Sequence, residues 1–127
     1  MSNPAAFAIT LDFAEELREP DDVIIAPFRF IQMLGLKQQE LADLARVHRT
    51  TVSDAPKNAK LQRFMRESLR VISAVRAING DLRRAIFWYR NTPIPEFDHR
   101  TAESLVVKGK TEAVVRYLDS ISSGSTG

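Results

Sequence analysis

The stretch Leu34–Ser53, LGLKQQELADLARVHRTTVS, decides how the fold begins. Leu41, Ala42 and Ala45 are small or apolar, which lets two helices cross closely, and Val47 and Val52 fill the core of the junction between them. This pattern predicts a helix over 37–45, a brief turn, and a second helix over 50–55. A short helix, a turn and another short helix in this spacing match the helix-turn-helix pattern.

The exposed start of the second helix carries the side chains that such a motif places in the major groove of DNA. Arginine can read guanine there, and threonine can contact a methyl group or a phosphate. An amide at the start of the first helix can hold a phosphate. The predicted DNA-contacting residues are Gln38, Arg49, Thr50, Thr51, Ser53 and Lys57.

Two residues depart from the usual motif. Arg46 stands in the turn, where glycine is common, so it either adopts a left-handed conformation or shifts the turn. Pro56 disfavours helix at Ala55 and limits the second helix to about two turns. Because the proline follows the positions that would read bases, it shortens the helix without removing them.

The remainder of the chain is also helical in pattern. A helix begins at Pro27, with an apolar face at Phe28, Ile31 and Leu34, and ends at Gly35. A long helix over 57–78 carries one apolar stripe: Leu61, Phe64, Met65, Ile72, Val75 and Ile78. Asp81 is the predicted cap of a helix over 82–90.

The last third contains a proline turn and two helices. NTPIPEF, residues 91–97, predicts an extended turn because it holds two prolines. Thr101 and Thr111 are the predicted caps of the helices that follow, and the last helix has the apolar face Val114, Val115, Leu118 and Ile121. We therefore predict an all-α fold: an arm over 1–23, a helix-turn-helix domain over 24–79, and a small helical domain over 80–127. The arm either packs on a partner or is a partly disordered tail.

The composition excludes several classes of protein. The chain has 127 residues, 44% of them hydrophobic, and no cysteine, so disulfides and thiolate metal sites are excluded. It has no apolar run near the 18 residues that a membrane span requires, and its N-terminus is a poor signal peptide. We expect a cytoplasmic protein with no membrane partner.

The charge is unevenly distributed. Residues 46–90 hold 11 basic and 3 acidic side chains, whereas residues 1–45 hold 3 and 8. A basic block of this kind is expected of a protein that binds a polyanion. The alternative is an ordinary solvated helix surface.

The sequence carries no pattern typical of an enzyme. There is no glycine-rich phosphate loop and no nucleophile elbow. His48 and His99 lie in predicted turns far apart and have no neighbour at ligand spacing, so we expect no metal and no cofactor. The acidic pairs within residues 1–23 are interpreted as solvated charge.

Residues Ala85–Gly124, AIFWYRNTPIPEFDHRTAESLVVKGKTEAVVRYLDSISSG, resemble the C-terminal domain of the Xre/MbcA/ParS antitoxin family. The family pattern is a helix that ends near tryptophan, an Asn-x-Pro turn, a Thr-led helix, a glycine and a final helix. Here the pattern is filled by Trp88, Asn91, Pro93, Phe97, Arg100, Thr101, Ala102, Leu105, Gly109, Val114, Val115, Leu118 and Gly124. Alanine at 102 departs from the usual proline. The resemblance covers about residues 24–124.

The resemblance implies an antitoxin of a type II toxin–antitoxin module, whose partner is a RES-domain toxin that consumes NAD or transfers ADP-ribose. In the family, the C-terminal region packs on the toxin and blocks entry to its NAD pocket, and the helix-turn-helix often represses the module's operon. The toxin-binding residues expected here are Arg116, Tyr117, Ser120, Ile121, Ser122 and Ser123. Arg and Tyr are common interface anchors.

Two alternatives to this function are a stand-alone helix-turn-helix transcription regulator and a protein-interaction module that no longer reads DNA. An ordinary solvated face remains the alternative for Arg116 and Tyr117, a frayed end for residues 122–127, and a core position for Trp88. We expect a homodimer or a hetero-oligomer of toxin and antitoxin.

Overall fold

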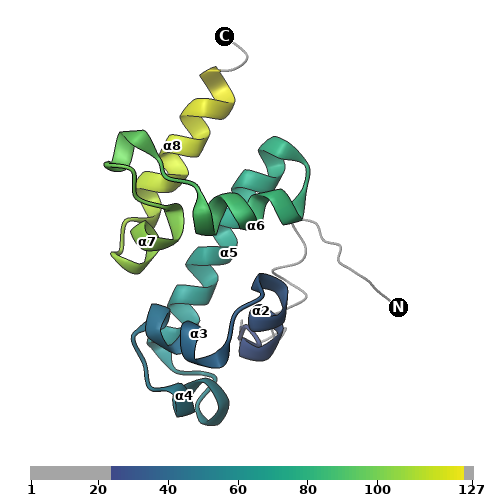
Figure 1. Ribbon diagram of the computed structural model, residues 1–127, viewed down its shortest axis with the longest axis vertical. Coiled ribbons are helices and arrows are strands. Elements are labelled where there is room, and N and C mark those ends of the chain that lie inside the picture. The colour runs from purple at the N-terminus through teal and green to yellow at the C-terminus, as the bar shows by residue number, and fades with distance from the viewer. Residues whose placement is uncertain (1–23, 125–127) are drawn as a thin grey trace. The chain divides into compact units, whose positions relative to one another are not determined.

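The computed structural model describes residues 24–124. The regular elements in that range are helices, and one isolated β-bridge also occurs there. The predicted all-α class is confirmed for this part of the chain. Figure 1 shows the elements in order: α2 Pro27–Leu34, α3 Gln38–Ala45, α4 Arg49–Asp54, α5 Ala59–Asn79, α6 Leu82–Asn91, the 3-10 helix η1 Pro95–Phe97, α7 Ala102–Val107 and α8 Thr111–Gly124. The predicted arm lies outside the described residues.

The chain divides into two compact units, and the division falls between Arg66 and Glu67, inside α5. The sequence suggested a domain boundary at 79/80, where Gly80 interrupts the helical pattern. A glycine marks the end of a helix, but α5 contributes its first turns to one unit and the remainder to the other. The assignment of a separate function to each unit stays a prediction.

Of the predicted core face of helix α2, Leu34 is buried and Ile31 is half-buried, but Phe28 is not part of the core. Pro27, Phe30 and Leu34 are buried, whereas Phe28 is 51% exposed. Phe30 packs edge-to-face on Phe64, with ring centroids 6.2 Å apart. Both sets of positions have helical spacing, and the packing against Phe64 selects the set that contains Phe30.

Arg46, in the turn between α3 and α4, adopts the left-handed conformation that glycine usually provides, and the turn is not shifted. Arg46 is left-handed, with φ 61° and ψ 47°, so the turn keeps its shape and the arginine carries the strain. The backbone N–H of Val47 donates to the carbonyl of Ala42 at 2.9 Å, which closes the end of α3. Helix α4 ends at Asp54, before Pro56, as predicted.

Helix α5 begins two residues later than predicted because Asn58 caps it. The Asn58 Oδ1 atom accepts a hydrogen bond from the backbone N–H of Leu61 at 3.1 Å. The predicted stripe from Leu61 to Val75 is buried, but Ile78 is 45% exposed. Ile78 lies in the last turn of α5, one residue before the helix ends.

Gln62 joins three segments of the first unit, and nothing in the apolar pattern predicted it. Its side chain is 3% exposed. Its Oε1 atom accepts from the N–H of Ile25 at 2.9 Å, and its Nε2 atom donates to the carbonyls of Ile25 and Pro56 at 2.8 and 2.7 Å. The buried side-chain amide of Gln62 therefore provides hydrogen-bond partners for backbone groups in two segments, the one before α2 and the one after α4.

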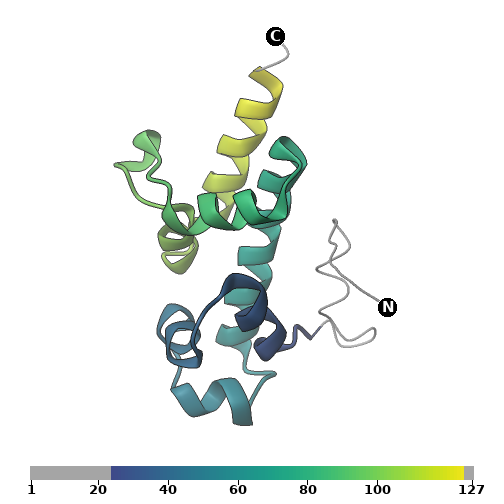
Figure 2. The same ribbon diagram turned by 45° about the vertical axis from the view of Figure 1, so that its right-hand side comes forward.

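In the second unit, α6 crosses the later part of α5 (Figure 2). The Asp81 carboxylate caps α6 as predicted, accepting from the N–H groups of Arg83 and Arg84 at 2.9 and 3.3 Å. Between the two helices, the hydroxyls of Ser68 and Tyr89 share a buried hydrogen bond of 2.6 Å. Burial raises the pKa of Tyr89 well above its ordinary value, so the phenol stays neutral and can donate this bond.

The segment predicted as an extended turn contains one turn of 3-10 helix, η1. Ile94 is buried and pairs with Arg100 in an antiparallel bridge, in which the Ile94 N–H donates to the Arg100 carbonyl at 3.0 Å. Pro95 fits the first position of η1 because that position needs no N–H donor. Proline therefore starts this helical turn.

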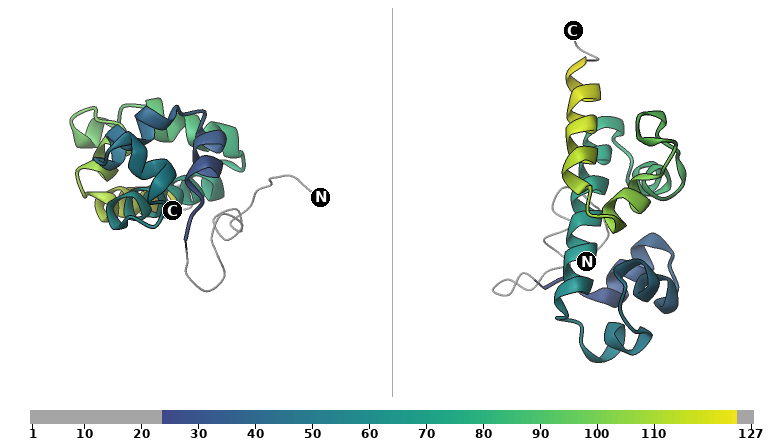
Figure 3. Two further views of the ribbon diagram at one scale, coloured as in Figure 1. Left: turned by 90° about the horizontal axis from the view of Figure 1, so that it is seen from below. Right: turned by 90° about the vertical axis from the view of Figure 1, so that its left-hand side faces the viewer.

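Two helices complete the second unit, and Figure 3 shows α7 and η1 on one side of α8. Thr101 caps α7 as predicted, because its Oγ1 atom accepts from the N–H of Ser104 at 3.1 Å. The prediction for Thr111 was wrong, since α8 already begins at Thr111 and the hydroxyl donates to Glu67 Oε1 at 2.8 Å. Val114 and Leu118 are buried as expected, whereas Ile121 is 39% exposed.

Candidate functional site

The start of α3 and the start of α4 are held together by one of the predicted DNA-contacting residues. The Gln38 Nε2 atom donates to the carbonyl of Arg49 at 2.9 Å. This bond brings Gln38 next to Arg49, whose side chain is exposed, as is that of Thr50. The buried Val52 turns the opposite side of α4 to the core.

Among the other predicted DNA-contacting residues, Ser53 and Thr51 are less available than Lys57. The Ser53 hydroxyl is directed back to its own helix, at 3.2 Å from the carbonyl of Thr50 and 3.1 Å from Asp54 Oδ1. Thr51 is half-buried, and Lys57 is exposed in the turn that follows α4. The accessible group is therefore Arg49, Thr50 and Lys57, with Gln38 behind them.

The basic block is divided between the two units. Residues 24–66 hold eight basic and three acidic side chains, which leaves a charge of +5. In the second unit, Arg70 and Arg90 are engaged by carboxylates. Arg90 Nε contacts Glu103 Oε2 at 3.0 Å, and Arg70 forms a two-point pair with Glu112, with its Nη2 atom 3.2 Å from Oε1. Residues 24–66 therefore form a basic part of the first unit, as expected of a segment that contacts a polyanion.

The pair of Arg70 and Glu112 also fastens the first turn of α8 to α5. Hydrogen bonding to Arg70 holds the pKa of Glu112 below its usual value and raises that of Arg70. The neighbouring bond from Thr111 to Glu67 joins the same two helices. The start of α8 is therefore fixed by two polar contacts, while its later residues carry the predicted partner-binding side chains.

The predicted toxin-binding residues form two groups on α8. Arg116, Ser120 and Ser123 are exposed at i, i+4 and i+7, so they share one face. The Ser120 hydroxyl donates to the carbonyl of Tyr117 at 2.8 Å. Ile121 is partly exposed one turn after Tyr117, and Ser122 is exposed beside it.

Tyr117 is half-buried because it packs on the proline turn. Its ring lies edge-to-face against Phe97, with centroids 5.8 Å apart and an interplanar angle of 77°. Burial, and then the neighbouring carboxylate of Glu96, raise the pKa of Tyr117. The alternative of an ordinary solvated residue is therefore wrong for Tyr117, which is part of the packing between α8 and η1.

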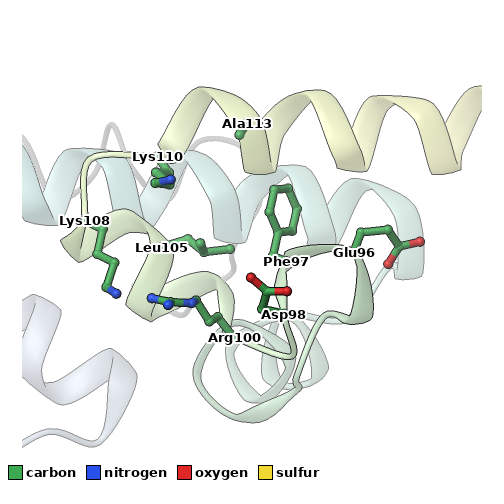
Figure 4. Close-up of a pocket in the computed structure, with 8 residues that line it drawn as sticks. All are labelled: Glu96, Phe97, Asp98, Arg100, Leu105, Lys108, Lys110 and Ala113. Carbon is green, nitrogen blue, oxygen red and sulfur yellow. The ribbon is translucent and has the colours of Figure 1, made fainter.

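A groove of about 380 Å³ lies between η1, α7 and the first turn of α8. Its lining combines apolar and charged side chains: Phe97, Leu105 and Ala113, with Glu96, Asp98, Arg100, Lys108 and Lys110. Figure 4 shows the lysines and the Arg100 guanidinium toward one end, Glu96 at the other, and Leu105 and Phe97 between them. Apart from Arg100, which belongs to the family pattern, the charged residues of this groove look like ordinary surface residues in the sequence.

Two aromatic residues of α6 are also accessible. Phe87 is 64% exposed, and Trp88 is half-buried, so the alternative of a core position for Trp88 holds only in part. Within residues 24–124, no three His, Cys, Asp or Glu side chains gather as a metal site would require. No helix in that range has the length and apolar character to cross a bilayer.

Sequence comparison yields no match to a family model and none to a curated protein. Among solved structures, this chain is similar to a chain in the crystal structure of the M. tuberculosis MbcT-MbcA toxin-antitoxin complex. The TM-score is 0.57 with 21% identical residues, and the similarity covers 78% of this chain and 92% of that chain. At this identity the similarity establishes the fold.

Proposed function

We propose that this protein is the antitoxin of a type II toxin–antitoxin module. The observation that carries the proposal is the likeness of its fold to a chain of a toxin–antitoxin complex, over nearly all of that chain. The sequence resemblance of residues 85–124 to the Xre/MbcA/ParS antitoxin family supports the same function independently. As part of this proposal, the chain acts in the cytoplasm as a binding protein, without enzymatic activity and without a cofactor.

The proposed partner is a RES-domain toxin, and the proposed mode of neutralisation is occlusion of its active site by the second unit. Support comes from the later part of α8, where Arg116, Ser120 and Ile121 are exposed, so a partner can contact them without unfolding the unit. Tyr117 would contribute from the edge of this surface. Its ring is already fixed on Phe97, which lowers the entropy lost on binding.

We further propose that the first unit binds the operator of the module and represses it. The exposed Arg49 and Thr50 at the start of α4, within residues 24–66 of net charge +5, favour this role. The same residues would serve the alternative function, a stand-alone transcription regulator. The two functions differ only in whether the second unit has a toxin to bind.

The test is co-expression of the chain with the neighbouring open reading frame. We expect the two products to co-purify and co-expression to maintain growth and cellular NAD. When the neighbour is expressed alone, growth and cellular NAD should both fall. A neighbour that is harmless alone and does not co-purify would exclude the antitoxin function. In that case specific promoter binding would support the stand-alone regulator.

Variants should separate the two units. Arg49→Ala is expected to weaken operator binding about tenfold or more, as loss of one base contact does, without releasing the toxin. A chain that ends at Leu118 keeps the buried residues of α8 and is expected to release the toxin while still binding DNA. Truncation before Thr111 is a poorer test, because it removes Val114 and Leu118 from the core.

A further inference from the structure

We propose that the groove between η1, α7 and α8 binds an acidic segment of the partner protein that carries one apolar side chain. The inference rests on the proposed function, because it names the chemistry of the partner segment. Carboxylates of that segment would lie at the cationic end of the groove, and its apolar side chain would cover the half-buried ring of Phe97.

Within the described part of the chain, the cations of this groove are not engaged in ion pairs, although Glu96 and Asp98 line the same groove. Among residues 24–124, no carboxylate forms an ion pair with Arg100, Lys108 or Lys110. Arg70 and Arg90 in the same unit do have carboxylate partners. Like charges that converge on one groove repel one another, and an anionic ligand relieves this repulsion.

The floor of the groove is fixed before any ligand arrives. The ring of Phe97 is held by Tyr117, and Leu105 is buried in the unit. An apolar side chain that lies on this floor would lose its exposure to water, at little cost in ordering the protein.

The corner that presents Arg100 is held by backbone hydrogen bonds. Asp98 and His99 are consecutive left-handed residues, with φ values of 58° and 63°. The bridge of Ile94 to Arg100 and the bond from the His99 N–H to the Ile94 carbonyl, at 2.9 Å, hold them there. Two non-glycine residues in this conformation are unfavourable unless the surroundings impose it, and these hydrogen bonds supply that constraint.

The carboxylates of the groove favour a protein over a nucleic acid. Glu96 and Asp98 line the same groove as the three cations. A nucleic-acid strand brings a phosphate with every nucleotide and would pass these carboxylates unfavourably. A peptide can place acidic residues only at the cationic end, and a volume of about 380 Å³ accommodates one or two side chains.

The first test is an NMR titration of the full chain with an acetylated and amidated peptide, Glu-Glu-Leu-Glu-Glu. We expect shifts of the amides in 94–113 and no such shifts with Lys-Lys-Leu-Lys-Lys. Lys108→Glu should weaken binding about fivefold, the upper range for one exposed charge. Arg83→Glu on α6 makes the same charge change away from the groove and is the matched control. Equal weakening by both variants, or shifts in 94–113 with duplex DNA but not with the peptide, would overturn the inference.

The second test uses the complex with the co-expressed neighbour product. Lys108→Glu combined with Lys110→Glu should lower its affinity at least tenfold, whereas Arg83→Glu should not change it. A complex of unchanged affinity in the groove variant contradicts the inference and leaves the antitoxin function intact. If the unaltered chain forms no complex, the proposed function fails, and the peptide titration alone decides whether the groove binds acidic segments.

Discussion

Replacing Arg46 by glycine should stabilise the first unit. A non-glycine residue in the left-handed conformation costs about 1–2 kcal/mol, and Arg46 is in that conformation at φ 61°. Glycine removes this cost but loses about 0.5–1 kcal/mol through the greater freedom of the unfolded chain. The side chain of Arg46 is exposed, so no buried contact is lost. The expected net gain is therefore about 0.5–1 kcal/mol.

The matched control is Arg46→Ala, which removes the same charge and keeps the strained backbone. Native-state hydrogen exchange of the amides in α3 and α4 reads the first unit alone, and it should show slower exchange in Arg46→Gly than in Arg46→Ala. Both variants lose one cation and should weaken DNA binding by a similar factor. Equal exchange rates in the two variants would show that the turn is not strained.

Three further changes test the polar contacts. Gln62→Leu leaves backbone groups in the core without partners and should cost about 2–4 kcal/mol of unfolding free energy in urea titrations. Ser68→Ala should cost about 1–3 kcal/mol because the buried phenol of Tyr89 loses its partner, and adding Tyr89→Phe should recover part of that loss; simple additivity of the two changes would refute a direct bond. Glu112 has a pKa below its ordinary 4.5, so its pairing with Arg70 stabilises the unit above that pH and is lost as pH falls through the lowered value. Acid titration of Arg70→Ala should lack this component, and an unchanged acid transition would contradict it.

The helices of this fold could be predicted from the sequence because their signals are local. Asp81 and Thr101 cap the next helix with their own side chains, and Pro56 limits α4 by its ring alone. Such signals act within three or four residues. The error at Phe28 has a different origin, since only the packing partner Phe64 distinguishes Phe30 from its neighbour.

The candidate sites were less predictable because they depend on distant contacts. Arg70 looked available to a polyanion until Glu112, 42 residues away, was found beside it. Gln62 is not part of the apolar stripe of its helix, yet its side chain is hydrogen-bonded to the backbone of Ile25, 37 residues away. The groove unites residues from 96 to 113 that share no periodicity. No local pattern reports such pairings, whereas the exposed start of α4 follows directly from where that helix begins.

Helix α8 separates the residues that hold the fold from those offered to a partner. Its last buried side chain is Leu118, and positions 119–123 are exposed. Substitutions at Ser120 or Ile121 therefore change little of the core and can accumulate without loss of folding. Recognition of a new partner can thus evolve in the final turns of this helix while the scaffold stays the same, so related chains with one fold could each come to match a different partner.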